Sequence, residues 1–150
     1  MARPTQAALT ARRVGAVPLG LYAHRRYLEA HGVPESFEDV GAFGIGYDRN
    51  GPMLRALRDL QIPLTRESFG FRSDNDLAQL AALRAGFGVG GCQTGIARRD
   101  PDLVPVLEHL FRFDMEIWVA MHEDLKASRR MRLMFDWLAE GLGDYVRESR

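Results

Sequence analysis

The sequence has little of what marks several classes of protein. It has one cysteine, Cys92, so it cannot form an internal disulfide. It has no apolar run of about 20 residues, the length that spans a bilayer. Residues 1–6 (MARPTQ) also lack the apolar stretch of a signal peptide. We therefore expect a cytoplasmic protein with no membrane partner.

An excess of charge is lacking too. Twenty lysine and arginine residues balance twenty aspartate and glutamate residues, giving a formal net charge of zero. A nucleic-acid-binding surface neutralises phosphates with clustered basic side chains, so this chain is not expected to bind DNA by itself. With 46% hydrophobic and 27% charged residues over 150 positions, the composition is that of a folded protein with one core or two small lobes.

The ionisable side chains show no spacing typical of a metal or catalytic site. The histidines are widely separated and form no i, i+4 pair: His24, His31, His109 and His122. The acidic clusters adjoin expected helix starts, where carboxylates cap the helix and interact with its dipole: Glu35, Glu38 and Asp39, and Glu123 and Asp124. We expect no metal, no cofactor and no catalytic acid–base pair.

What the chain does contain is an alternation of strand-like apolar segments with segments of helical period, which is typical of an α/β protein with a largely parallel sheet. The expected strands are 17–23, 43–47, 69–72, 89–97, 104–107 and 115–121. The expected helices are 25–30, ending at Gly32, then 50–60 with Asn50 as cap, 73–85, and 127–146. Pro18 indicates that the first strand lies at an edge or a crossing. Spacings of three and four in the last helix predict one buried face: Met131, Met134, Phe135, Leu138, Leu142 and Tyr145.

The first candidate site is Ser73-Asp74-Asn75-Asp76, which directly follows strand 69–72 and has the form of a capping box. Open α/β sheets bind ligands where a helix begins at the carboxyl end of a strand. Backbone N–H groups there, with the Ser73 hydroxyl and the Asn75 amide as added donors, can hold a carboxylate or another anion. The alternative is that Ser73 only caps the helix. Asp74 and Asp76 also count against an anion, because they place negative charge at the same point.

The second candidate is the glycine-rich segment 86–93 (GFGVGGCQ), where glycines let a ligand or a strand approach the backbone. It predicts Gly91, Cys92 and Gln93 as ligand neighbours, together with Gly46 of strand 43–47. The segment is not a phosphate loop, since no Lys-Ser or Lys-Thr follows and its glycines enter a strand. Cys92 is a nucleophile only if a histidine reaches it; a single cysteine in an apolar strand is usually a small buried residue.

Four segments in order, 19–40, 73–90, 100–107 and 115–138, resemble the effector-binding domain of LysR-type transcriptional regulators, and they cover essentially the whole chain. The resemblance implies a fold like the type 2 periplasmic binding proteins, with two α/β lobes, two crossover strands (17–23 and 115–121), and an effector in the cleft between lobes. It implies a remnant of the first subdomain and the first crossover strand at 1–22. The second subdomain would occupy 23–118, and the end of the second crossover strand and the returning helix 119–150.

The resemblance further implies an N-terminally truncated chain, with one nearly complete lobe and remnants of the other. Family members bind DNA through an N-terminal winged helix-turn-helix and assemble as dimers and tetramers; this chain lacks that DNA-binding part. Exposed edges and apolar faces then predict homo-oligomers or swapped elements. Family members often have Leu-Pro where this chain has Cys92-Gln93, so Gln93 becomes a candidate polar contact.

The leading hypothesis is therefore an effector-binding regulatory domain, not an enzyme, for a small organic and anionic ligand. Its affinity is expected to be weak because one wall of the cleft is missing. One alternative is a free-standing solute-binding protein of the same fold, which would need a secretory signal. Another is an enzyme that uses Cys92, which would require a reactive, low-pKa thiol.

Overall fold

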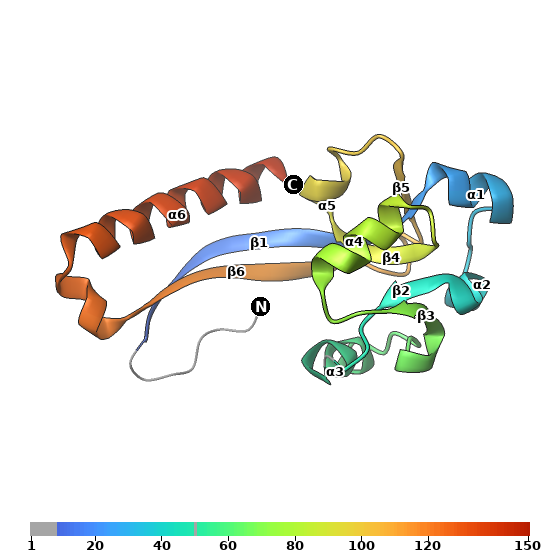
Figure 1. Cartoon of the computed structure of the whole chain (residues 1–150), viewed down its shortest axis with the longest axis horizontal. Helices are drawn as coiled ribbons and strands as arrows, with labels where there is room; N and C mark the ends of the chain where they lie inside the picture. Colours follow the sequence, from blue (N-terminus) through green and yellow to red (C-terminus); the bar gives the residue numbers. More distant parts are fainter. Residues whose placement is uncertain (1–8, 50) are drawn as a thin grey trace. The chain divides into compact units, whose positions relative to one another are not determined.

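The computed structural model describes residues 9–49 and 51–150, shown in Figure 1. The strands are β1 (Leu9–His24), β2 (Gly44–Gly46), β3 (Phe69–Arg72), β4 (Val89–Gln93), β5 (Leu103–Val106) and β6 (Phe113–His122). The helices are α1 (Arg25–His31), α2 (Phe37–Val40), α3 (Gly51–Asp59), α4 (Asp76–Arg84), α5 (Thr94–Ala97) and α6 (Arg129–Glu148). Three 3₁₀ turns complete the fold: η1 (Gly41–Phe43), η2 (Arg66–Ser68) and η3 (Glu123–Ala127). Asn50, the predicted cap of α3, lies outside the described residues.

The chain divides into two compact units. The first unit contains residues 9–18 together with Phe113–Arg150, and the second contains Leu19–Arg112. The strand β1 belongs to both, with Pro18 as the last residue of its first-unit part. Proline has no backbone N–H to give to a ladder, and the pairing of β1 with β4 begins one residue later, at Leu19. The predicted subdomain boundaries stay a prediction.

The second unit holds the sheet on which the candidate site lies. Its strand order is β3-β2-β4-β1-β5. The strand β2 is parallel to both β3 and β4, whereas β1 is antiparallel to β4 and β5. The prediction of a largely parallel sheet is therefore wrong for β1. Helical crossovers through α3 and α4 join β2, β3 and β4 and make them parallel, but no such crossover sets the direction of β1.

Several elements begin or end where short sequence signals predict. The strand β3 has the predicted bounds, and α1 ends where Gly32 takes φ +84° and donates its N–H to the Leu28 carbonyl. The predicted strand 89–97 is wrong in its second half, because β4 ends at Gln93 and α5 follows. That turn of helix buries the small side chain of Ala97 in the core.

The core of the second unit lies between this sheet and α4 and α5. The residue Leu83 of α4 is 1% exposed there. It belongs to a buried cluster with residues from four strands and α5: Tyr22, Ile45, Cys92, Ala97 and Leu103. Leu77, in the first turn of the same helix, is 76% exposed and lies outside this core.

The first unit is a pair of strands, β1 and β6, with α6 alongside. Its buried cluster consists of Val17, Ile117 and Val146. The predicted buried face of α6 is partly wrong, because Leu142 and Tyr145 pack against this cluster whereas Met134 and Leu138 are exposed. The row of α6 residues that faces the strands runs instead through Ala139 and Val146, which are buried. A Cβ atom added at Gly15 would lie 2.7 Å from Val146 Cγ1, so α6 packs closely over β1.

Candidate functional site

The candidate site lies in the second unit, at the carboxyl ends of three parallel strands. The strands β2, β3 and β4 end at Gly46, Arg72 and Gln93, and the register places Gly46 opposite Arg72. Because parallel strands end at the same edge of a sheet, the segments after them converge. All seven predicted site residues lie on these strand ends or on the loop after β3: Gly46, Ser73, Asp74, Asn75, Gly91, Cys92 and Gln93.

The main chain of Ser73 is held from two sides. Its N–H donates to the Gly46 carbonyl at 3.0 Å, and its carbonyl accepts from the Gln79 amide at 2.6 Å. The Ser73 Oγ atom accepts a hydrogen bond from the Asn75 N–H at 3.2 Å. These bonds tie the loop to β2 and α4, and they leave the Ser73 O–H as a donor in a fixed position.

The helix cap is Asn75, so the prediction that Ser73 caps α4 is wrong. Asn75 has extended backbone angles, and its Oδ1 accepts from the N–H groups of Leu77 and Ala78 at 2.9 and 3.2 Å. An asparagine two residues downstream of a serine competes for the same helix start, and here it satisfies two N–H groups at once. A ligand at this edge therefore meets the Asn75 side chain and the Ser73 hydroxyl instead of those two N–H groups.

The two carboxylates that would repel a bound anion, those of Asp74 and Asp76, accept hydrogen bonds from other residues of the protein. Asp74 accepts hydrogen bonds from the N–H groups of Asp48 and Arg49, each at 3.0 Å. Asp76 accepts from the Tyr47 hydroxyl at 2.9 Å. Burial, and then the bond to Asp76, raise the pKa of Tyr47 well above its usual value, so this phenol stays a donor. Residues 47–49, which directly follow β2, thus donate hydrogen bonds to both carboxylates.

Sequence reasoning missed the role of Tyr47 and Asp48. Asp48 also accepts from Arg66 at 2.6 Å, which links η2 to the same loop. A signal was present, because both residues directly follow β2 and parallel topology brings that end beside the end of β3. Their partners lie too far along the chain for a local pattern to identify.

The two site glycines differ in what surrounds them. A Cβ atom at Gly46 would lie 2.6 Å from carbons of the Phe69 ring, so this glycine is needed for core packing. At Gly91, which is exposed, the nearest atom to an added Cβ would be Leu19 Cδ2 at 4.0 Å. Packing explains Gly46, whereas Gly91 leaves its backbone open to approach.

At the end of β4 the side chains alternate between the core and the edge. Cys92 is 6% exposed and belongs to the core cluster, so only its backbone faces a ligand at this edge. Gln93 is half-buried and lies opposite Leu19 of β1. The next residue, Thr94, accepts a hydrogen bond from the Tyr22 hydroxyl at 3.2 Å.

Burial raises the pKa of the Cys92 thiol to about 11 from an ordinary 9.0. Native-state alkylation by iodoacetamide at neutral pH should therefore be roughly one hundredfold slower than in the urea-unfolded chain, since each pKa unit changes the thiolate fraction tenfold. The native rate should keep rising with pH beyond 9, where the unfolded rate levels off. Mass spectrometry of timed samples measures the alkylation rate of the native and of the unfolded chain. If the two rates were equal, Cys92 would have to be considered a reactive group.

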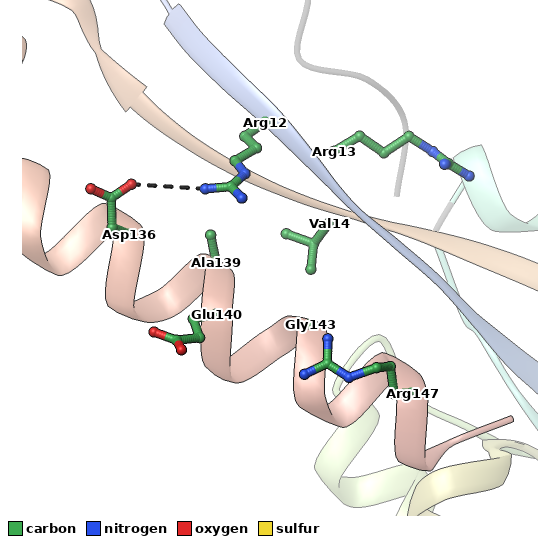
Figure 2. A pocket seen from close by; sticks show the side chains of 8 residues that line it. All are labelled: Arg12, Arg13, Val14, Asp136, Ala139, Glu140, Gly143 and Arg147. Atoms are coloured by element: carbon green, nitrogen blue, oxygen red, sulfur yellow. Dashed lines mark ion pairs between the residues drawn. The ribbon is translucent and has the colours of Figure 1, made fainter.

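A hollow lies within the first unit, between β1 and α6, and has a volume of about 510 Å³. Figure 2 labels the residues that line it: Arg12, Arg13, Val14, Asp136, Ala139, Glu140, Gly143 and Arg147. Each of its arginines has a carboxylate partner. Arg12 lies 3.8 Å from Asp136, Arg13 donates to Glu116 at 2.9 Å, and Arg147 bonds Asp144. The arginines of this wall are therefore paired within the protein, and the hollow offers a weaker case for a ligand site than the strand ends do.

Within the described ranges, no cluster of three or more histidine, cysteine, aspartate or glutamate side chains is suited to a metal ion. None of the helices within residues 9–49 and 51–150 has the length and apolarity needed to span a bilayer.

The LysR substrate binding domain family matches residues 1–143. The chain belongs to this family. Domains of this kind are parts of transcriptional regulators and not enzymes, and their fold is that of the type 2 periplasmic binding proteins, as predicted. Among curated proteins, none matches the chain.

Solved structures show the same fold. The regulatory domain of CrgA from Neisseria meningitidis is 21% identical with a TM-score of 0.75, covering 94% of this chain and 72% of that one. Full-length CrgA is 23% identical with a TM-score of 0.76; 93% of this chain matches, but only 49% of CrgA. The OxyR2 regulatory domain of Vibrio vulnificus, as a cysteine-to-serine variant, is 15% identical with a TM-score of 0.64, over 96% and 69% of the two chains. At these identities the likeness shows the fold, and the chain spans about half of a whole regulator.

Proposed function

We propose that this effector-binding regulatory domain takes a small organic anion at the carboxyl-terminal edge of β2, β3 and β4. The observation that carries the proposal is the convergence there of fixed neutral donors with an open stretch of backbone. The Ser73 hydroxyl and the Asn75 amide supply donors on one strand end, and Gly91 leaves main chain accessible on another. Gln93 adds a side-chain amide at the end of β4, and Gly46 holds the Ser73 loop in place by accepting the Ser73 N–H.

Neutral donors suit an anion whose charge the protein does not cancel with a buried cation. Because Asp74 and Asp76 accept hydrogen bonds from Asp48, Arg49 and Tyr47, these carboxylates do not take up the Ser73 and Asn75 donors. A carboxylate bound by Ser73 then forms a charge-assisted hydrogen bond, the stronger kind in proteins. Binding energy gained in this way biases the domain between its ligand-free and bound states, which is how an effector regulates.

DNA recognition is proposed to go through a separate domain of the regulator. The family domain accounts for residues 1–143, and the chain has a net charge of zero. A surface that binds DNA gains most of its affinity from clustered cations, so the role left to this domain is to sense the effector.

The test is thermal unfolding in the presence of small carboxylates, each paired with its neutral amide. In the wild type, a carboxylate at one hundred times its Kd should stabilise the fold by about 2.7 kcal/mol. Ser73→Ala should weaken binding about tenfold or more, because a hydrogen bond to a charged group is lost. Gly91→Ala should leave the unliganded melting temperature unchanged, because its methyl group meets only an ordinary contact, and it should reduce the shift, because that group covers the exposed backbone.

The matched control is Ser36→Ala. Ser36 caps α2 and accepts from the Asp39 N–H at 3.3 Å in the same unit, so the same atom is removed away from the site. Its unliganded stability should fall while its ligand shift stays intact. The site is wrong if Ser73→Ala and Gly91→Ala both keep the full shift, and the anionic ligand is wrong if amides stabilise as well as carboxylates.

A further inference from the structure

The segment that joins α1 to α2 borders a hollow of about 410 Å³ in the second unit, which is called the α1 pocket below. Its lining includes Tyr27 and His31 of α1, and Glu35 and Asp39 beyond it, and none of the strand-end site residues. Two of the lining residues carry carboxylates, and none is a lysine or an arginine. Small-molecule sites have cavities of this size. The lining therefore favours a ligand with a positive charge.

The two carboxylates of the α1 pocket differ in how they are held. Asp39 Oδ2 accepts hydrogen bonds from the N–H groups of Glu35 and Ser36 at 2.9 and 2.8 Å. These bonds hold the pKa of Asp39 below its usual value, so its charge is present at neutral pH. The Glu35 carboxylate has neither an ion pair nor a hydrogen bond with any residue that the structure describes. The pocket thus has one fixed and one unpaired negative charge, at the helix end where the dipole also favours cations.

The hydroxyl of Tyr27 is a third polar group at the α1 pocket, and it has no partner among residues 9–49 and 51–150. By contrast, the hydroxyls of Tyr22 and Tyr47 each donate to a neighbouring side chain. The whole Tyr27 residue is only 4% exposed. Its oxygen is nevertheless reachable, because in the described part of the chain Thr10 Oγ1 alone is a fully enclosed polar side-chain atom without a partner. The α1 pocket is where a ligand reaches this hydroxyl.

Packing accounts for the ring of Tyr27 but not for its hydroxyl. The His31 ring stacks on it with centroids 4.5 Å apart and planes 17° apart, and Phe43 lies edge-on at 5.8 Å. A phenylalanine would keep both contacts. Burial raises the pKa of Tyr27, so the hydroxyl stays neutral and keeps a lone pair that can accept a hydrogen bond. A hydroxyl held in this way is costly to leave without a partner.

We propose that the α1 pocket binds a small organic ammonium ion. An ammonium group has three N–H donors and no acceptor, and the Tyr27 oxygen and the carboxylates of Glu35 and Asp39 are three acceptors. Hydrogen bonds between a cation and a carboxylate are among the stronger ones in proteins. A bare metal ion fits less well, because no cluster in the described ranges is suited to a metal. The proposal does not depend on the strand-end site, whose ligand has the opposite charge.

The test is an NMR titration of the full 150-residue chain with n-butylammonium chloride. Backbone amide signals of residues 31–39 should shift and saturate, whereas those of Ser73 and Asn75 should not move. Tyr27→Phe should raise the Kd about tenfold, because a hydrogen bond to a charged group is lost, and its unliganded urea midpoint should stay unchanged. Glu35→Gln should also raise the Kd, since it removes the unpaired charge.

Matched variants and probes complete the experiment. Tyr22→Phe removes the same atom from a tyrosine outside the pocket, and Glu29→Gln removes the same charge from an exposed position of α1 outside the pocket. Both should keep the wild-type Kd. Equal concentrations of 1-butanol or sodium chloride should produce no saturable shift at residues 31–39. The proposal is overturned if n-butylammonium gives no saturable shift there, if either control probe shifts the signals equally, or if Tyr27→Phe and Glu35→Gln both bind like the wild type.

Discussion

Replacing Leu83 by alanine should lower the free energy of unfolding by about 2–5 kcal/mol. Leu83 is 1% exposed and packs from α4 into the main core cluster of the second unit. The substitution removes its buried methyl groups and leaves a cavity that the surrounding strands can only partly fill. Urea unfolding followed by circular dichroism measures the loss through the denaturation midpoint.

The chain offers a matched control for this experiment in the same helix. Leu77 is 76% exposed, so Leu77→Ala makes the same chemical change without a cavity. Its effect should stay within about 0.5 kcal/mol, as for other surface substitutions. If the two variants lost the same stability, α4 would not pack as described.

A methyl group at Gly88 should be at least as damaging, costing about 3 kcal/mol or more, the upper end of overpacking. A Cβ atom there would overlap the carbonyl oxygen of Phe43 in η1. Backbone cannot rotate away as a side chain can, so the segment that leads into β4 must shift against η1 to admit Gly88→Ala. Soluble yield and the urea midpoint of the variant measure the effect.

Gly91→Ala is the control, because the same methyl group three residues later, within β4, would meet only Leu19 Cδ2 at 4.0 Å, an ordinary contact. Gly70 makes the equivalent approach to the Ala42 carbonyl and should behave like Gly88. Similar stabilities for Gly88→Ala and Gly91→Ala would contradict the close contact between η1 and its neighbouring strands.

Features set by nearby residues could be predicted from the sequence. The strand β3 and the end of α1 at Gly32 depend on apolar content and on one left-handed glycine, and both are confirmed. The start of α4 could not be settled in this way, since Ser73 and Asn75 are both good capping residues two positions apart. Only the hydrogen bonds of Asn75 to Leu77 and Ala78 decide between them.

Features set by distant partners could not be predicted. Helix α6 has two rows of apolar residues along its surface, one through Met134 and Leu138 and one through Ala139 and Val146. The helical period of the sequence does not say which row is buried. The close approach of Val146 to Gly15, on another element, selects the second. The same holds for the candidate site. The predicted ends of the strands were enough to name Ser73 and Gly91 as candidate site residues. The hydrogen bonds that Asp74 accepts from the loop after β2 could not be predicted, because they depend on the parallel pairing of β2 and β3.

The position of β1 has a consequence for how the chain is made. Its residues 19–24 lie between β4 and β5, whose partner residues 89–93 and 103–106 come roughly 70 to 85 residues later. During synthesis at about 5–20 residues per second, β1 leaves the ribosome several seconds before either neighbour exists. A newly made β1 is thus an unpaired apolar strand for that interval, open to pairing with other chains until Val106 has been made.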